Sequence, residues 1–376
     1  MLFVRVAGSV ACALLVATSC ASDANTVTTA AAAGPTVEMG QPFPAERCAD
    51  NKAAGTITYL SGYDFAASAS IVDVLVAEQK GYYDELCLDV NIQPGLFATN
   101  YPAINNNSAQ FASAGSFSAL VEYALGAPGS ELVTLAVEGR SAIDTLIVKP
   151  GTADTLAALS GATIGVKEAM PASVRAMLAK AGLFSGTGYT IEPIAGFDPT
   201  VHIALPNIAG FAAFKSNEPG QLDRAGVSYT EFDPSSEGIP GSFGVLYTSR
   251  TFMAAHPTAA TDFMRATMKG LADAVSDPSA ASMVAIDFID NNGNPNGLSS
   301  DGETFRWQTE SHLVADTSTT TDPMGVPEPD ELTEEVKSYA SVGLFGGKAP
   351  DISELYDASI LTAVYDTSGT VIWPST

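Results

Sequence analysis

The sequence contains few combinations of residues that could carry out bond chemistry. Its three histidines, His202, His256 and His312, are far apart, and no two have the spacing that places side chains on one turn of a helix. A histidine-based metal site or nucleophile therefore has little support. The 42 Asp and Glu residues form pairs at many spacings, so an acidic pair alone does not indicate a glycosidase. We expect no catalytic residue, no metal and no cofactor.

Two glycine-containing segments match catalytic motifs only in part. Residues 115–119, Gly-Ser-Phe-Ser-Ala, lack the closing glycine of a nucleophile elbow. Residues 346–348, Gly-Gly-Lys, lack the earlier glycine of a phosphate-binding loop. These segments therefore favour a function that binds a ligand without changing its bonds.

Aromatic and polar residues near predicted strand ends are better suited to holding a planar ligand. Tyr63 and Phe117 each follow a predicted strand, and Asp64 and Ser116 beside them could fix the orientation of the ligand. Arg140 lies near a predicted crossing between lobes and could bind an anion instead. The further aromatic candidates are Phe65, Phe97 and Phe197.

Two strand-helix-strand units must position these residues. Alternating or β-rich runs predict the strands, and apolar residues at helical spacing followed by glycine predict the helices between them. Units of this kind build parallel sheets with helices on both faces and ligands at the carboxyl ends of the strands. We therefore predict an α/β fold of two lobes, each a mostly parallel sheet. The predicted units are 56–60, 71–81 and 88–92, then 162–166, 171–181 and 189–193.

The order of these units also predicts the domain organisation. Segments 132–137, 145–148 and 241–247 are candidate crossings between the lobes, and the last third is mostly helical. We expect that last third to return to the first lobe. The predicted parts are a signal peptide at 1–19, a lipid-anchored tether at 20–50, the first part of lobe 1 at 51–140, lobe 2 at 141–243 and the rest of lobe 1 at 244–376.

The N-terminus has the features of an export signal. Arg5 precedes an apolar run at 6–17, which is shorter than the roughly 20 residues that a transmembrane helix needs. The sequence Ala-Thr-Ser-Cys at 17–20 resembles the lipobox of bacterial lipoproteins, so Cys20 is the candidate lipid anchor. Lipoboxes usually carry Leu at the first of these positions, which leaves ordinary signal cleavage open. Residues 21–46 are rich in small and polar types and predict a flexible tether. We expect a protein at the outer face of the cytoplasmic membrane.

The remaining cysteines predict one disulfide. Loss of Cys12 with the signal and acylation of Cys20 leave Cys48 and Cys87 in the folded part. Two thiols outside the cytoplasm are expected to pair. Two buried free thiols are the alternative, because sequence alone does not show whether their α-carbons lie close enough.

The charge of the chain excludes one class of partner. The formal net charge is −25, with only 17 Lys and Arg residues. Nucleic-acid binding depends on clustered positive charge, so we expect no nucleic-acid partner. Direct adsorption to anionic lipid is disfavoured for the same reason.

Residues 75–83 predict a helix that ends in a glycine and two aromatic residues, and Leu-Asp-Val at 88–90 follows as the start of a strand. This order resembles the solute-binding proteins of ABC importers for nitrate, sulfonate and thiamine precursors, which usually have glycine where this chain has Cys87. The resemblance implies a two-lobed periplasmic-binding fold that closes on a small molecule, with an importer permease as partner. We expect a monomer. Further matching segments are 111–115, 159–166, 255–257 and 263–266.

The segment 215–222 resembles the Asn-Glu segment of the thiamine pyrimidine precursor-binding branch. A carboxylate and an amide together suit an aminopyrimidine, which would make Asn217 and Glu218 ligand residues. A helix N-terminus, capped by Asn217 and favoured by the charge of Glu218, is the alternative, and both can hold. The preferred ligand is such a planar heteroaromatic. Riboflavin, an alkyl sulfonate or nitrate, and a pyrimidine-synthase-like enzyme on the same fold are the alternatives.

Overall fold

The computed structural model describes residues 34–167, 169–316 and 322–375. The predicted signal peptide, Cys20 and the first part of the predicted tether therefore lie outside the described residues. Within them, no helix has both the length and the apolar character that a membrane crossing requires.

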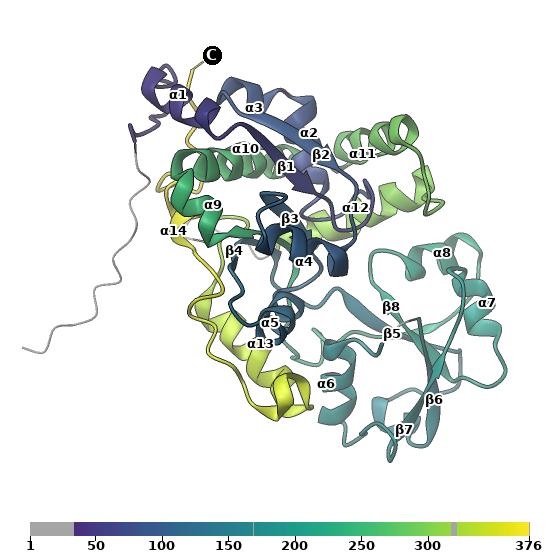
Figure 1. Cartoon of the computed structure of the whole chain (residues 1–376). Helices are drawn as coiled ribbons and strands as arrows, with labels where there is room; N and C mark the ends of the chain where they lie inside the picture. The colour runs from purple at the N-terminus through teal and green to yellow at the C-terminus, as the bar shows by residue number, and fades with distance from the viewer. Residues whose placement is uncertain (1–33, 168, 317–321, 376) are drawn as a thin grey trace, which may run out of the picture. The chain divides into compact units, whose positions relative to one another are not determined.

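The first sheet has five strands in the order β2-β1-β3-β10-β4. The strands β1 to β4 are labelled in Figure 1. β1 runs parallel to β2 and β3, whereas β10 is antiparallel to β3 and β4. The sheet therefore begins with the predicted strand-helix-strand unit and ends with a late strand inserted beside β4. The bounds are β1 Thr56–Leu60, β2 Asp89–Gln93, β3 Phe111–Ala114, β4 Leu132–Gly139 and β10 Phe243–Ser249.

Helices cover both faces of this sheet because successive side chains of a strand point to opposite faces. Phe111 packs in the core beneath α2, α10, α11 and α12, whereas its neighbour Ala112 packs in the core beneath α4, α5 and α13. Trp307 is the largest fully buried side chain of the first of these cores. The bounds are α2 Val72–Gln79, α4 Phe97–Asn105, α5 Phe117–Gly126, α10 Pro257–Ser276, α11 Pro278–Asn292, α12 Ser300–Ala315 and α13 Pro329–Ser341.

The second sheet has five strands in the order β7-β6-β8-β5-β9. β6 is parallel to β7 and β8, and β5 is antiparallel to β8 and β9. Leu146 faces the core with α6, whereas Ile147 faces the core with α7 and α8. The bounds are β5 Asp144–Val148, β6 Ala162–Val166, β7 Tyr189–Pro193, β8 Gly210–Phe214, β9 Thr230–Phe232, α6 Ala172–Lys180, α7 Pro199–Ala204 and α8 Glu218–Arg224.

The predicted α/β fold of two helix-covered sheets is confirmed, and each sheet is mixed. The predicted crossings 132–137, 145–148 and 241–247 form the strands β4, β5 and β10, so the chain passes between the sheets in the short links 140–143 and 233–242. The remaining elements are α1 Ala45–Ala53, α3 Tyr82–Glu85, α9 Arg250–Ala255, α14 Ser359–Thr362 and the 3₁₀ helices η1 Leu156–Leu159 and η2 Leu344–Gly347.

The folded body begins before residue 51, which corrects the end of the predicted tether. Helix α1 buries Arg47, whose guanidinium binds both carboxylate oxygens of Asp262 on α10 at 2.6 and 3.0 Å. Cys48 is disulfide-bonded to Cys87, and their α-carbons are 5.3 Å apart. The backbone of Cys87 is left-handed, with φ of 60°, a conformation that glycine adopts most easily. A glycine would therefore also suit this position.

Candidate ligand-binding site

The loops that follow β1 and β2 bring two aromatic rings to the carboxyl edge of the first sheet. Tyr63 is half-buried in the loop after β1 and pairs with Leu96 in the loop after β2. The ring of Phe97 lies directly on Gly62, where an added Cβ would be 1.8 Å from the ring. Gly62 is therefore required for Phe97 to reach this edge. The carboxyl edge of parallel strands is where ligands bind in folds of this kind.

The second sheet brings charged and aromatic residues to its own carboxyl edge. Lys167 follows β6, and its ammonium group donates to the buried carboxylate of Glu218, which begins α8. The same ammonium lies 5.6 Å from the centre of the Phe197 ring, which is 71% exposed. Such a cation and ring attract each other through the quadrupole of the ring. Lys167 and Phe197 therefore form an accessible pair that suits a planar ligand.

Three carboxylates hold the loop that connects β1 to α2. The backbone amides of Ala67, Ala69 and Ser70 donate to Glu303, Glu310 and Glu138, respectively, at 2.7, 2.7 and 2.9 Å. Charge-assisted bonds of this kind are about twice as strong as neutral ones. These three bonds anchor residues 67–70 of the loop, and the backbone earlier in the loop is left-handed at Asp64, with φ of 52°.

Glu310 also links the two sheets. Its second oxygen accepts a hydrogen bond of 2.7 Å from the hydroxyl of Ser216, which lies between β8 and α8. Both side chains are buried. Burial raises the pKa of Glu310 to about 7, although the Ala69 amide, Arg306 and Ser216 each oppose that rise. Glu310 therefore titrates near neutral pH while it joins α12 to the second sheet.

This titration predicts how stability depends on pH. Because the pKa of Glu310 is raised from 4.5 to about 7 on folding, the folded state binds more protons than the unfolded state between these pH values. Stability therefore falls as pH rises through this window, by at most about 1.4 kcal/mol per pH unit for one group. Once the pH is above the pKa of about 7, the contribution of Glu310 to the free energy of unfolding no longer changes.

Urea unfolding of the native chain and of Glu310→Gln at pH 5, 6, 7 and 8 checks this expectation. The native chain should lose stability relative to the variant up to about pH 7, and no further above it. Asp73 and Asp144, whose pKa values burial raises to about 6, are present in both proteins and cancel from the difference. If the free energies of unfolding of the two proteins changed with pH in the same way, Glu310 would not be the group that causes the loss of stability.

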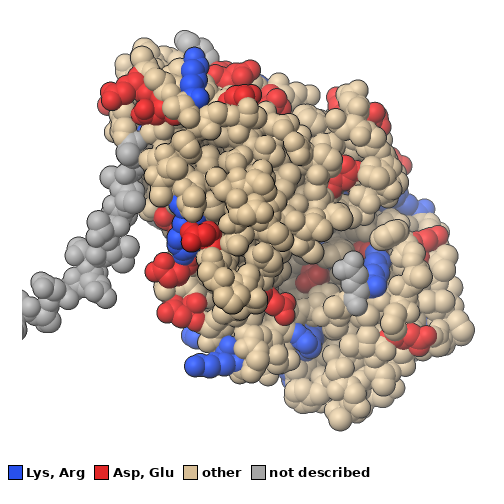
Figure 2. All heavy atoms as spheres, in the orientation of Figure 1, with Lys and Arg blue, Asp and Glu red and all other residues tan. Residues whose placement is uncertain are grey.

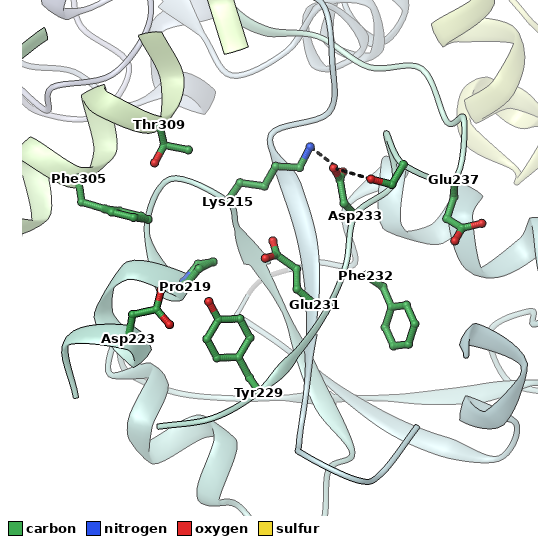
Figure 3. A pocket seen from close by; sticks show the side chains of 11 residues that line it. Lys215, Pro219, Asp223, Tyr229, Glu231, Phe232, Asp233, Glu237, Phe305 and Thr309 are labelled. Carbon is green, nitrogen blue, oxygen red and sulfur yellow. Dashed lines mark hydrogen bonds and ion pairs between the residues drawn. The ribbon is translucent and has the colours of Figure 1, made fainter. Parts of the chain in front are cut away.

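A cavity of about 520 Å³ lies on the neighbouring face of α12. Figure 3 shows Phe305 and Thr309 of α12 on one side of it and Lys215, Glu231 and Tyr229 of the second sheet on the other. Lys215 is paired with Asp233 at 2.6 Å. Asp223, Glu231, Asp233 and Glu237 give the lining an excess of negative charge over this one lysine. The cavity therefore disfavours anions, as does the surface in Figure 2, where Asp and Glu are the prevailing charges.

The chain's sequence matches a known family across most of both sheets. The family model described as NMT1/THI5 like matches residues 68–281. The chain belongs to the NMT1/THI5-like family. The matched region contains the second sheet entirely and ends within α11, so α12 lies outside it. Among the described residues, no group of three or more His, Cys, Asp or Glu residues could hold a metal ion.

Individual relatives of this NMT1/THI5-like protein support the same fold. It is 27% identical to the riboflavin-binding protein RibY of Chloroflexus aurantiacus over 290 residues, which are 73% of this chain and 76% of that protein. The alkanesulfonate-binding protein SsuA of Xanthomonas axonopodis pv. citri has a TM-score of 0.53, with 13% identity and coverage of 85% and 98% of the two chains. The nitrate-binding protein NrtA of Synechocystis PCC 6803 has a TM-score of 0.55, with 12% identity and coverage of 82% and 87%. These two structures show the shared fold alone.

The structure places the predicted site residues of the first sheet in different surroundings. Tyr63 lies at the carboxyl edge as expected from its position. Asp64 is 4% exposed, and its Oδ2 atom has no hydrogen-bond partner among the described residues. Ser116 caps α5 by accepting the amide of Ala119 at 3.2 Å. The prediction for Phe117 is corrected, because its ring is fully buried in the core with α4, α5 and α13.

The remaining predicted residues have partners within the protein. Arg140 binds the carboxylate of Asp322 and the carbonyl of Val326, so its guanidinium is not free for an anion. This corrects its predicted role. The side chain of Asn217 accepts from Gln221 at 2.9 Å and does not cap α8. Glu218 is fully buried and accepts from Lys167 and from the Phe214 amide. The sequence prediction did not include Lys167, Glu303 and Glu310, whose partners are remote in sequence, or Arg306, which pairs with Glu303 on the same helix.

Proposed function

We propose that this chain is the solute-binding component of an ABC-type importer and that it binds a small planar heteroaromatic ligand between the carboxyl edges of its two sheets. The observation that carries the proposal is the placement of aromatic rings on both edges. Tyr63 and Phe97 come from the first sheet, and Phe197 comes from the second with Lys167 beside it. Rings of this kind stack on planar ligands with an offset or tilted geometry. Closure around the ligand would be selected by its higher affinity for the closed form.

A flavin is the ligand that these observations favour. RibY, the similar protein from Chloroflexus aurantiacus, is named for riboflavin, and an extended tricyclic ring can contact aromatic residues of both edges. The aminopyrimidine of a thiamine precursor is the second candidate, because Asn217 and Glu218 do follow β8. Such a ligand would have to displace Lys167 from Glu218. Sulfonate and nitrate are the weakest candidates, because acidic residues prevail on the protein.

The cellular setting of this function is also a proposal. Export, lipid attachment at Cys20 and a position at the outer face of the cytoplasmic membrane rest on residues 1–20 of the sequence. The permease partner and the monomeric state follow from the proposed role. A binding protein for an importer needs no bond chemistry, so we propose no enzymatic activity.

Calorimetric titration of the purified protein tests the ligand. Riboflavin, 4-amino-5-hydroxymethyl-2-methylpyrimidine and taurine represent the three ligand classes. We expect riboflavin to bind with micromolar or better affinity and with quenching of its fluorescence on stacking. If none of the three binds in the micromolar range, the proposed ligand class is wrong.

Removal of the exposed ring of Phe197 should weaken this binding. Loss of an aromatic contact of the stacked kind costs about 0.5–1.5 kcal/mol beyond the buried area, so Phe197→Ala should raise the riboflavin Kd about tenfold. Phe184→Ala is the matched control, because Phe184 is 55% exposed on the same sheet but precedes the amino end of β7. Equal affinities of the two variants would exclude Phe197 from the site.

A further inference from the structure

Helix α12 presents three charged residues on one face toward the carboxyl edges of the sheets. Glu303, Arg306 and Glu310 are three and four positions apart, the spacing of neighbours on a helix surface. Residues 305 and 309, which line the acidic cavity, lie on a different face. Because α12 lies outside the region that the family model matches, these three residues are a feature of this chain that the family match does not supply.

The two glutamates of this face have complete structural roles, whereas the arginine does not. Glu303 and Glu310 hold the backbone amides of the loop after β1. Arg306 donates only through Nε, at 3.2 Å to each oxygen of Glu303. Its two terminal nitrogens make no hydrogen bond to any residue that the structure describes. A guanidinium has five N–H donors in a rigid fork, so the outer end of this fork is available.

Arg306 lies between two contacts that α12 makes with the loops after β1 and β8. Glu303, three positions before it, accepts from the Ala67 amide after β1, and Glu310, four positions after it, accepts from the Ser216 hydroxyl after β8. Burial lowers the pKa of Arg306, but Glu303, Glu310 and Glu218 together raise it. Arg306 is therefore on the part of α12 that joins the two sheets, and its side chain is still 13% exposed.

We propose that Arg306 is a specificity-determining residue that binds an acceptor edge of the ligand, which for a flavin is a carbonyl oxygen together with the unprotonated ring nitrogen beside it, O4 with N5 or O2 with N1. This inference rests on the proposed function. The planar fork of arginine can donate two parallel hydrogen bonds to such an edge, whereas the single ammonium of lysine cannot reproduce that geometry. Glu303 fixes the orientation of the fork by holding Nε. An aminopyrimidine offers a ring nitrogen and an amino donor there, so it fits the fork less well.

A purely structural role for Arg306 is the competing explanation. The guanidinium would then only neutralise Glu303 and Glu310. A lysine at position 306 would still neutralise Glu303 and Glu310, whereas a glutamine would not. Neither residue can donate the two parallel hydrogen bonds of the guanidinium to the ligand. The two explanations are therefore separated by the lysine variant.

Titration of riboflavin into the native protein, Arg306→Lys and Arg306→Gln tests the proposal, with thermal unfolding of each measured in parallel. We expect Arg306→Lys to keep the native unfolding temperature within about 2 °C while its riboflavin affinity falls about 10- to 100-fold, the usual effect of losing hydrogen bonds to a charged group. Arg250→Lys is the matched control, because the side chain of Arg250 pairs with the exposed Glu354; this variant should bind riboflavin as the native protein does.

Two further ligands identify the edge that is bound. Replacing each of the two carbonyl oxygens of riboflavin in turn by sulfur weakens the acceptor at that edge. The native protein should therefore prefer riboflavin to one of the two thio analogues, and Arg306→Lys should show less of this preference. Native affinity in Arg306→Lys, or an unchanged preference among these flavins, would overturn the proposal while leaving flavin binding intact. Failure of the native protein to bind any of these flavins would instead refute the proposed flavin ligand, and this inference with it.

Discussion

Asp262→Ala is expected to lower the free energy of unfolding by about 3–5 kcal/mol, the range for breaking a buried ion pair by removing one partner. The Asp262 carboxylate is fully buried and accepts from Arg47, Arg265 and the Asn51 amide, at 2.6 to 3.2 Å. Its removal would leave two buried guanidinium groups facing each other. Burial already lowers the pKa of Arg265, and without Asp262 the nearby charge of Arg47 would add to that destabilisation.

Urea unfolding at pH 7 followed by circular dichroism measures this loss. Asp287→Ala on α11 is the control, because Asp287 is exposed and its side chain makes no hydrogen bond or ion pair with the described residues; such surface changes usually stay within about 0.5 kcal/mol. A loss of less than about 1 kcal/mol in Asp262→Ala would show that the arginines find other partners. Arg265 already donates to the carbonyls of Ala363 and Ile372. It would therefore keep these two partners in the variant, which could reduce the loss.

Reduction of the disulfide is expected to have an effect of similar size. The bond joins residues 39 positions apart, and closing a loop of that length removes entropy from the unfolded chain worth about 4 kcal/mol at 25 °C. The native chain with and without dithiothreitol should therefore differ by about this amount in urea unfolding. The double variant Cys48→Ser with Cys87→Ser should match the reduced protein and should not respond to dithiothreitol. Equal stability of the oxidised and reduced native chain would contradict the expectation.

Cys87 allows a sharper comparison. Its left-handed backbone costs a non-glycine residue about 1–2 kcal/mol, whereas glycine adopts it freely but loses about 0.5–1 kcal/mol through extra freedom in the unfolded chain. The double variant with Cys48→Ser and Cys87→Gly should therefore lose somewhat less free energy of unfolding than the double variant with Cys48→Ser and Cys87→Ser. We thus expect the Cys48–Cys87 disulfide to stabilise the fold in spite of the left-handed backbone conformation that it places on Cys87.

The local elements could be predicted from the sequence because they depend on nearby residues. The alternation at 56–60 and 162–166 and the glycines after the first helices correspond to β1, β6 and their partners. Helix α12 was not predicted. Its buried residues include Glu303 and Glu310, so its inner face is polar and lacks the apolar stripe on which such predictions depend.

The surroundings of the predicted site residues could not be predicted from the sequence, because burial and pairing depend on distant residues. Phe117 and Tyr63 both follow strands, but only the packing of α4, α5 and α13 shows that the Phe117 ring belongs to a core. Arg140 is paired with Asp322, 182 residues away. Lys167 is paired with Glu218, 51 positions away. Pairings at such separations leave no local pattern.

Hydrogen bonds between residues 40–42 and the C-terminal segment determine how the folded part of the chain would respond to a pulling force. Gly40 donates to the carbonyl of Trp373, and Ser375 donates to the carbonyl of Gln41, each at 2.8 Å. Helix α1 is also bound to α10 through Arg47 and Asp262, and to Cys87 through the disulfide of Cys48. A force applied to residues 40–42 is therefore transmitted to the helices of the first sheet and not through the links 140–143 and 233–242. A molecule held there would not have its sheets drawn apart, so fluorescent labels that report their separation belong on α8 and α11, away from the point of attachment.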